Sequence, residues 1–326
     1  MNNYLNVIVL ILSLLGSSFR THGQVNYLNY HKEIEKCEQL IVESKFEEAV
    51  NNLDSLFNQF HFIFLRDIKL ATQLSAIEKD LKSGFRFIKL GILNGWTLEN
   101  ITKNDKLRLF HENPEWENIR YQYDSLHEKY LSKLNTDVKN QVHEMFKNDQ
   151  KKALGALFRI GQKSKNKYAE KRFAPQSEKH MKQLDQILNK QGYPGEQLIG
   201  NNLWGSVILS HHNSISVNYN SKDTLFTHLR PKLMDALKKG EISPYELAVI
   251  EDWKIAALNA HELTSYGFLG AIPSHTVLDR VNENRTNIGL RSIELRNDLI
   301  DFEQATGFNL NLPKSWHKGK ITVANN

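Results

Sequence analysis

Residues 43–57 read ESKFEEAVNNLDSLF, and the spacing of the apolar side chains in this stretch decides the fold class. From Phe46 to Phe60 the apolar residues recur three and four positions apart, which is the period of one face of an α-helix. The same period runs through the preceding residues, and Ser44-Lys45 forms a short joint. The sequence therefore predicts a pair of amphipathic helices, over 30–43 and 46–60.

Residues 43–57 resemble the second half of a tetratricopeptide repeat, a helix–turn–helix unit of about 34 residues. A second pair is predicted over 65–79 and 81–93, and a degenerate third unit over 104–134. One such unit cannot bury its apolar face alone, so neighbouring units stack into a superhelix. We therefore expect residues 24–134 to form a TPR-like helical-hairpin repeat region.

A compact helical domain is predicted over 135–312, followed by a C-terminal tail over 313–326. A strong helix start lies at Ser243-Pro244-Tyr245-Glu246, which offers an N-cap serine, a first-turn proline and a glutamate at N3. The other helices are expected from 138 into 150, and over 176–190, 198–210, 223–239 and 277–306, with a loop over 166–175. No alternating run of β-branched residues is long enough to anchor a sheet, so the predicted fold class is all-α.

The composition is that of a globular protein, with 40% hydrophobic and 24% charged residues among 326. The single cysteine, Cys37, excludes an internal disulfide framework and any Cys-based zinc or iron–sulfur site. Neither a phosphate-binding G-x-x-x-x-G-K-[ST] loop nor a G-x-G-x-x-G turn occurs. No His-Glu pair has a second histidine four residues after the first, so we predict neither a zincin-type metal site nor a cofactor.

The N-terminus has the anatomy of a secretory signal peptide. Residues 5–15, LNVIVLILSLL, form an apolar core too short to span a bilayer, and Thr21 and Gly23 put small residues before Gln24. Signal peptides usually begin with a basic segment, but residues 1–4, MNNY, contain no Lys or Arg. An uncleaved anchor is therefore the alternative. We predict a signal peptide over 1–23, a periplasmic or extracellular location, no stable membrane span after cleavage, and no nucleic-acid partner.

Positive charge concentrates in residues 135–191, which hold 13 basic and 6 acidic side chains. The excess peaks in Lys151–Arg172. This stretch is either a solvated helix end and linker or a surface for anionic glycan or lipid headgroups. The partner classes that we expect are another envelope protein or an anionic glycan.

Two adjacent histidines and two aspartates are the candidate site residues. His211 and His212 follow an apolar helical stretch, so at least one ring approaches an apolar environment, as a core or capping histidine, a general base or a metal ligand. Asp252 has only apolar neighbours one turn away, so it either anchors a loop or serves a site. Asp149 precedes Lys151 and Lys152, which favours a solvated ion-pair cluster over a binding role.

Residues 145–312 resemble domain-of-unknown-function family 6624, a group of uncharacterised exported bacterial proteins. The residues that carry the resemblance are Asp149-Gln150, Leu184-x-x-Ile187, Gly192-Tyr193-Pro194, Ile199-Gly200, His211, Leu229-x-Pro231-x-Leu233, Ala236, Gly240, Ala248, Asp252, Tyr266-Gly267 and Val281-Asn282-x-Asn284-Arg285-x-x-Ile288-Gly289-Leu290. Several polar family positions are replaced here, for example by Trp253 after Asp252. The resemblance implies a polar pocket that this chain has partly lost.

Two functions follow from these features. The first is a binding or scaffold protein at the cell envelope, built on the helical repeats. The alternative is a hydrolase-like enzyme in which His211 acts as base, Asp252 or Asp149 orients it or binds substrate, and Tyr266 donates a hydrogen bond. The hydrolase hypothesis requires His211 and Asp252 to meet in one buried pocket.

Overall fold

The computed structural model describes residues 26–259, 262–272, 274–312 and 319–323. Over these residues the chain is all-α, as predicted, and its β pairing is limited to an isolated bridge between Ile272 and Val323. The predicted signal peptide and most of the predicted tail lie outside the described residues. Within the described parts, no helix has the length and apolarity needed to cross a bilayer.

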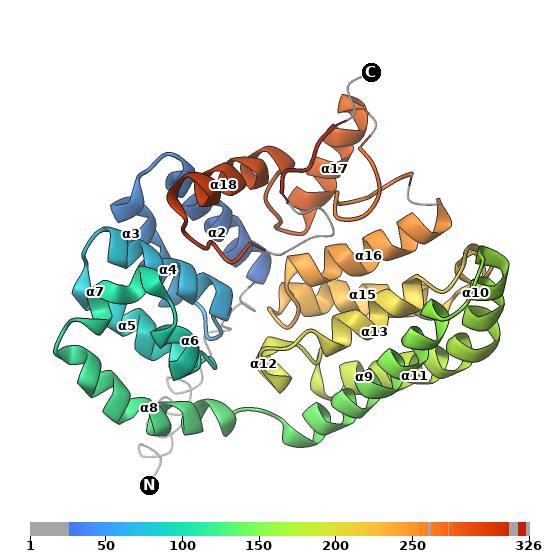
Figure 1. The fold of residues 1–326 in the computed structure, drawn as a ribbon, viewed down its shortest axis with the longest axis horizontal. Helices are drawn as coiled ribbons and strands as arrows, with labels where there is room; N and C mark the ends of the chain where they lie inside the picture. Colours follow the sequence, from blue (N-terminus) through green and yellow to red (C-terminus); the bar gives the residue numbers. More distant parts are fainter. Residues whose placement is uncertain (1–25, 260–261, 273, 313–318, 324–326) are drawn as a thin grey trace, which may run out of the picture.

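The N-terminal helices pack against one another in chain order (Figure 1). They are α2 (Tyr27–Val42), α3 (Phe46–Phe57), α4 (Leu65–Ile77) and α5 (Leu81–Ile92). Their apolar stripes meet in one cluster, in which Ile34 and Ile41 of α2 are buried together with Leu53 of α3. A residue with positive φ turns the chain after α2 and after α4, Ser44 and Lys79 respectively. Both predicted helix pairs are therefore present.

The third predicted unit is irregular. It consists of α6 (Leu98–Thr102), the 3₁₀ turn η1 (Asp105–Leu107), α7 (Arg108–His111) and the long helix α8 (Glu115–Leu131). Pro114 stands directly before α8, where its missing N–H costs no helical hydrogen bond.

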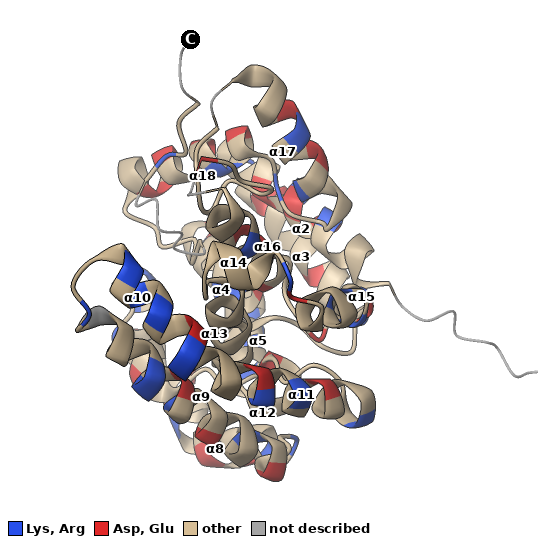
Figure 2. Ribbon diagram, turned by 90° about the vertical axis from the view of Figure 1, so that its right-hand side faces the viewer, with Lys and Arg blue, Asp and Glu red and all other residues tan. Residues whose placement is uncertain are grey.

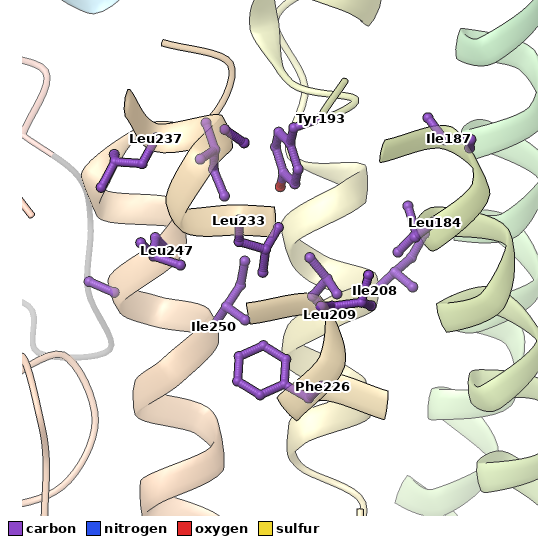
Figure 3. Packing of buried hydrophobic residues seen from close by; sticks show 14 of the residues in the cluster. Leu184, Ile187, Tyr193, Ile208, Leu209, Phe226, Leu233, Leu237, Leu247 and Ile250 are labelled. Atoms are coloured by element: carbon purple, nitrogen blue, oxygen red, sulfur yellow. The ribbon is translucent and has the colours of Figure 1, made fainter. Parts of the chain in front are cut away.

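The second half surrounds α13, which contacts α9, α11 and α16. Its helices are α9 (Thr136–Leu157), α10 (Gln162–Tyr168), α11 (Ala174–Gln191), α12 (Glu196–Ile199), α13 (Trp204–Asn213), α14 (Val217–Asn220), α15 (Leu225–Lys238) and α16 (Pro244–Leu258). Ile208 and Leu209 of α13 lie in the middle of a core that Leu184, Leu233 and Ile250 complete (Figure 3). The predicted start of α16 is confirmed, because Ser243 and Glu246 form a reciprocal capping box.

The prediction of a loop over 166–175 is wrong, because these residues are helical. Helix α10 runs into a π-helical turn, η2 (Ala169–Phe173), and then directly into α11. Pro175, at the end of the predicted loop, lies in the first turn of α11, where a proline is tolerated.

Two predicted helices are broken by glycines. The one over 198–210 stops at Gly200 (φ 91°), where a Cβ would lie 2.6 Å from the hydroxyl of Tyr130. The one over 277–306 divides into α17 (His275–Asn287) and α18 (Ile293–Thr306) at Gly289 (φ 75°). The turn at Gly289 is held by the buried Arg285, whose guanidinium donates to the carbonyl oxygens of Arg291 and Tyr266.

Helix α18 returns to the N-terminal helices and packs on α2 (Figure 1). Its Leu295 and Leu299 lie in the core cluster of α2 and α3. The predicted boundary at residue 134 assigns α18 to the second domain, so the two predicted domains share a core through this helix.

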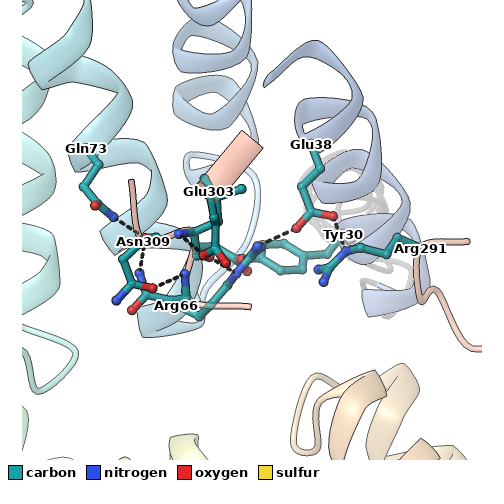
Figure 4. Close-up of polar contacts among 10 residues, drawn as sticks. Tyr30, Glu38, Arg66, Gln73, Arg291, Glu303 and Asn309 are labelled. Atoms are coloured by element: carbon teal, nitrogen blue, oxygen red, sulfur yellow. Dashed lines mark hydrogen bonds and ion pairs between the residues drawn. The ribbon is translucent and has the colours of Figure 1, made fainter. Parts of the chain in front are cut away.

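A buried ion-pair cluster reinforces this return (Figure 4). Glu38 of α2 pairs with Arg66, at 2.6 Å, and with Arg291, which precedes α18. Arg66 also pairs with Asp67 at 2.9 Å, and the hydroxyl of Tyr30 donates to Asp67 at 2.7 Å. We call Glu38, Arg66, Asp67 and Arg291 the brace.

Candidate functional site

Helices α9 and α13 bring Asp149 and His211 together. The Oδ2 atom of Asp149 lies 2.5 Å from Nδ1 of His211. The Asp149 side chain is fully buried, whereas that of His211 is 28% exposed. The carboxylate therefore anchors the inner edge of the ring, and Nε2, on the other edge, is the nitrogen that can exchange a proton with a ligand.

Local sequence explains why Asp149 faces inward. Val138, Val142 and Met145 of α9 are buried, and Asp149 continues their spacing of four, three and four residues. This spacing predicts that Asp149 faces the core, whereas the neighbouring lysines favoured a solvated ion-pair cluster. That interpretation is wrong, because the side chain is buried on the core face of α9.

A cavity of about 340 Å³ opens beside His211. Its wall is mixed: alanines and the rings of Phe173 and Trp253 are apolar, while Lys165 and two side-chain amides are polar. The residues around the cavity are Ala153, Ala156, Gln162, Lys165, Asn166, Ala169, Phe173, His211, Ser214, Ile215 and Trp253. A cavity of this size and lining suits one end of an amphiphilic small molecule.

A second buried histidine lies close enough to Asp149 to feel its charge. His180 of α11 is buried, and burial lowers its pKa while the charge of Asp149 acts in the opposite direction. Its Nε2 lies 2.7 Å from the side-chain amide of Gln176. Among the described residues, neither Nδ1 of His180 nor Oδ1 of Asp149 has a hydrogen-bond partner. His180 was not among the site residues predicted from the sequence.

Asp252 belongs to a different cluster. Its carboxylate is fully buried and accepts hydrogen bonds from the hydroxyl of Thr264 and from the backbone N–H groups of 265, 266, 268 and 269. Burial raises the pKa of Asp252, and these hydrogen bonds oppose the shift. His211 thus contacts Asp149, whereas Asp252 binds the 264–269 loop. The prediction that His211 and Asp252 meet in one buried pocket is wrong.

Tyr266 also lies in that second cluster. Its hydroxyl donates to Glu251 at 3.0 Å, and Glu251 in turn pairs with Arg230 at 2.9 Å. Burial, followed by the charge of Glu251, raises the pKa of Tyr266. Neither Tyr266 nor Asp252 lines the cavity beside His211.

The neighbour of His211 has a structural environment. His212 is fully buried, with Nδ1 2.9 Å from the hydroxyl of Ser177 and Nε2 3.2 Å from Asp223. Burial raises the pKa of Asp223, but hydrogen bonds with His212 and Lys254 outweigh it and hold that pKa below its usual value. Serine, histidine and aspartate meet here, yet Ser177 is buried and His212 does not reach the surface.

Within the described ranges, no three His, Cys, Asp or Glu side chains gather closely enough to hold a metal ion. The Asp149–His211 pair places an imidazole nitrogen capable of proton transfer at the wall of a cavity. No protein-family model, no curated protein and no solved structure matches the chain. The resemblances to family 6624 and to tetratricopeptide repeats stay predictions from the residues.

Proposed function

We propose that the second half of the chain carries a general acid–base site for hydrolysis, with His211 as the base and Asp149 as its positioning residue. The observation that carries the proposal is the pairing of a fully buried carboxylate with a partly exposed imidazole at the wall of a cavity. A carboxylate at Nδ1 fixes the ring and its tautomer and stabilises the imidazolium that forms during proton transfer.

In this proposal Nε2 of His211 removes a proton from water, and the oxygen of that water attacks an acyl carbon held in the cavity. The bond from the acyl carbon to the leaving oxygen then breaks, and the imidazolium returns the proton to that oxygen. Phe173 and Trp253 offer apolar contacts, and Lys165 offers a cation for a polar or anionic end. An ester with an apolar acyl group fits this lining.

The test uses residues 24–326 and a series of p-nitrophenyl esters of increasing acyl length. We expect release of p-nitrophenol to fall about 100-fold or more in His211→Gln, since a general base contributes ~10²–10⁴ in rate. The control His228→Gln removes an exposed imidazole on α15 and should leave the rate unchanged. Equal rates in His211→Gln and the parent chain would contradict the proposal.

A binding or scaffold function is the second candidate, and a second cavity favours it. This cavity, of about 350 Å³, lies between α2 and the start of α16 and is lined in part by Glu38, Arg66, Leu203 and Arg291. The successive helix packing of α2 to α5 supports a TPR-like binding surface for an envelope protein or an anionic glycan.

Thermal-shift measurements with cell-envelope glycan fragments separate the two candidates. A ligand of the second cavity should lose its stabilising effect in Leu203→Glu, which puts a charge at the rim, and keep it in His211→Gln. The opposite pattern would assign the ligand to the His211 cavity.

An exported location is part of the proposal, supported by the signal-like segment over 1–23. Expression of the full chain in a Gram-negative host should yield a periplasmic product whose mass is that of residues 24–326. A cytoplasmic product of full mass would count against export.

A further inference from the structure

The joint between α9 and α10 exposes large apolar side chains. Leu154 is 52% exposed, Phe158 82% and Ile160 95%. Single exposed apolar residues are common on protein surfaces, but three within seven residues form a patch that water solvates poorly. We call residues 151–172 the α9–α10 corner and residues 158–161 its tip.

The fold makes the tip project. At Gly155 a Cβ would lie 2.0 Å from the hydroxyl of Tyr168, so the missing side chain lets α10 fold down on α9. That hydroxyl donates to the carbonyl oxygen of Lys152 at 3.1 Å. At the tip itself, no atom other than those of Gly161 (φ 80°) and its two chain neighbours lies within 4 Å of the Cβ position, which is open space.

Positive charge lies on the helices that lead into and out of this apolar tip. The corner contains eight Lys and Arg residues and one acidic residue, Glu170. Blue segments along α10 mark several of them in Figure 2. Glu170 accepts a hydrogen bond from Ser216, and none of the eight cations forms an ion pair with a described acidic side chain. The corner therefore presents uncompensated charge around exposed apolar groups.

We infer that the α9–α10 corner binds the surface of an anionic lipid bilayer, with Phe158 and Ile160 entering the acyl boundary and the cations meeting the headgroups. Apolar insertion and attraction to anionic headgroups are the two components of interfacial membrane binding. An anionic glycan would complement the cations but would leave the apolar tip in water. A bilayer satisfies both features.

The same corner forms one wall of the His211 cavity. Ala153 and Ala156 come from α9, and Gln162, Lys165 and Asn166 from α10. Docking of the corner would therefore bring the cavity close to the headgroup region, where amphiphilic substrates are held. The membrane contact itself does not depend on the proposed hydrolysis.

Vesicle co-sedimentation tests the inference on residues 24–326, which keep every described residue and lack the apolar segment 5–15. We expect binding to vesicles of phosphatidylcholine mixed with phosphatidylglycerol and about tenfold weaker binding to phosphatidylcholine alone. Phe158→Ser/Ile160→Ser should lower affinity about tenfold or more, because each removes apolar contact with the bilayer. Lys163→Glu/Lys167→Glu should do the same, and neither lysine lines the cavity.

Matched controls lie elsewhere on the surface. Tyr121→Ser/Leu131→Ser removes exposed apolar groups from α8, and Lys238→Glu/Lys239→Glu reverses exposed charges at the end of α15. Both should bind like the parent chain. Equal binding by the tip variant and its control would overturn the inference. Retention on an anionic polysaccharide that needs the lysines but not the tip, without vesicle binding, would overturn it in favour of a glycan.

A second measurement reports insertion directly. The chain has five native tryptophans, so the signal of position 158 is the difference between the spectra of Phe158→Trp and the parent chain. This difference emission should shift to shorter wavelength and be quenched by brominated lipid when anionic vesicles are added. An unchanged spectrum would contradict insertion. Because His211→Gln should bind vesicles normally and Phe158→Ser/Ile160→Ser should hydrolyse a soluble ester normally, failure of one proposal is distinguishable from failure of the other.

Discussion

The brace near α2 and the Asp149–His211 pair both bury carboxylates, but they differ in how completely the carboxylates are satisfied. In the brace, Glu38 lies between Arg66 and Arg291, and Asp67 between Arg66 and Tyr30. Oε1 of Glu38 and Oδ1 of Asp149 both lack a hydrogen bond among the described residues, but Oε1 of Glu38 lies 2.6 Å from the Arg66 guanidinium, which is positively charged. A buried polar group without a partner costs free energy. The brace thus compensates each of its buried charges with an opposite charge, whereas the pair keeps unused hydrogen-bonding capacity near a cavity.

Breaking the brace should have the largest effect on stability. Glu38→Ala leaves Arg66 and Arg291 largely buried without their shared carboxylate, and removing one partner of a buried ion pair costs ~3–5 kcal/mol. Urea unfolding measures the loss. The control on the same helix is Glu33→Ala, which removes an exposed pair with Lys36 and should cost about 0.5 kcal/mol or less. Equal losses in the two variants would remove the structural role that we assign to the brace.

A contact between the N-terminal helices and the second half, at Glu196, should have a smaller and pH-dependent effect on the free energy of unfolding. Glu196 of α12 accepts a hydrogen bond from the backbone N–H of Leu65, at the start of α4, at 2.7 Å. Burial, together with the charges of Glu246 and Asp67, raises the pKa of Glu196 to about 8. The folded chain therefore keeps this proton up to about pH 8, whereas the unfolded chain releases it near pH 4.5.

Because the folded state binds this proton more tightly, the contribution of Glu196 to stability is present below about pH 4.5 and is lost as pH rises through about 8. Glu196→Gln keeps the acceptor oxygen and cannot ionise. The difference in unfolding free energy between the variant and the parent chain should grow in favour of the variant by about 1–3 kcal/mol from pH 5 to pH 9. A difference that is constant over this range would show that the carboxyl of Glu196 is not protonated in the fold at neutral pH.

Sequence patterns predicted the elements of this fold better than the contacts between them. Apolar spacing located the helices from α2 to α5, and the Ser243–Glu246 cap marked the start of α16. The break at Gly289 was missed because Arg285 holds that turn through the distant carbonyl of Tyr266. Local patterns contain no such partner.

The same limit applies to the site. His211, Asp149 and Asp252 were all candidates from the sequence. In the structure both aspartates are buried: Asp149 contacts His211, and Asp252 accepts backbone hydrogen bonds. The required pairing of His211 with Asp252 was wrong, whereas the alternative partner, Asp149, contacts His211. The choice depends on which helices pack: α13 contacts both α9 and α16, and only α9 presents its aspartate to His211. Asp252 instead faces the 264–269 loop, whose backbone N–H groups cannot be anticipated from helical spacing.

The smallest effect on stability is expected at the pair itself. Asp149→Asn keeps an oxygen that can accept a hydrogen bond from His211 and removes a buried charge whose Oδ1 lacks a hydrogen bond among the described residues. Its cost in unfolding free energy should therefore stay within about 1 kcal/mol, far below that of Glu38→Ala. The rate of the proposed hydrolysis should fall at least tenfold, because a neutral amide does not stabilise the imidazolium. A loss of stability as large as that of Glu38→Ala, with hydrolysis unchanged, would make Asp149 a structural residue and erase the contrast between the two regions.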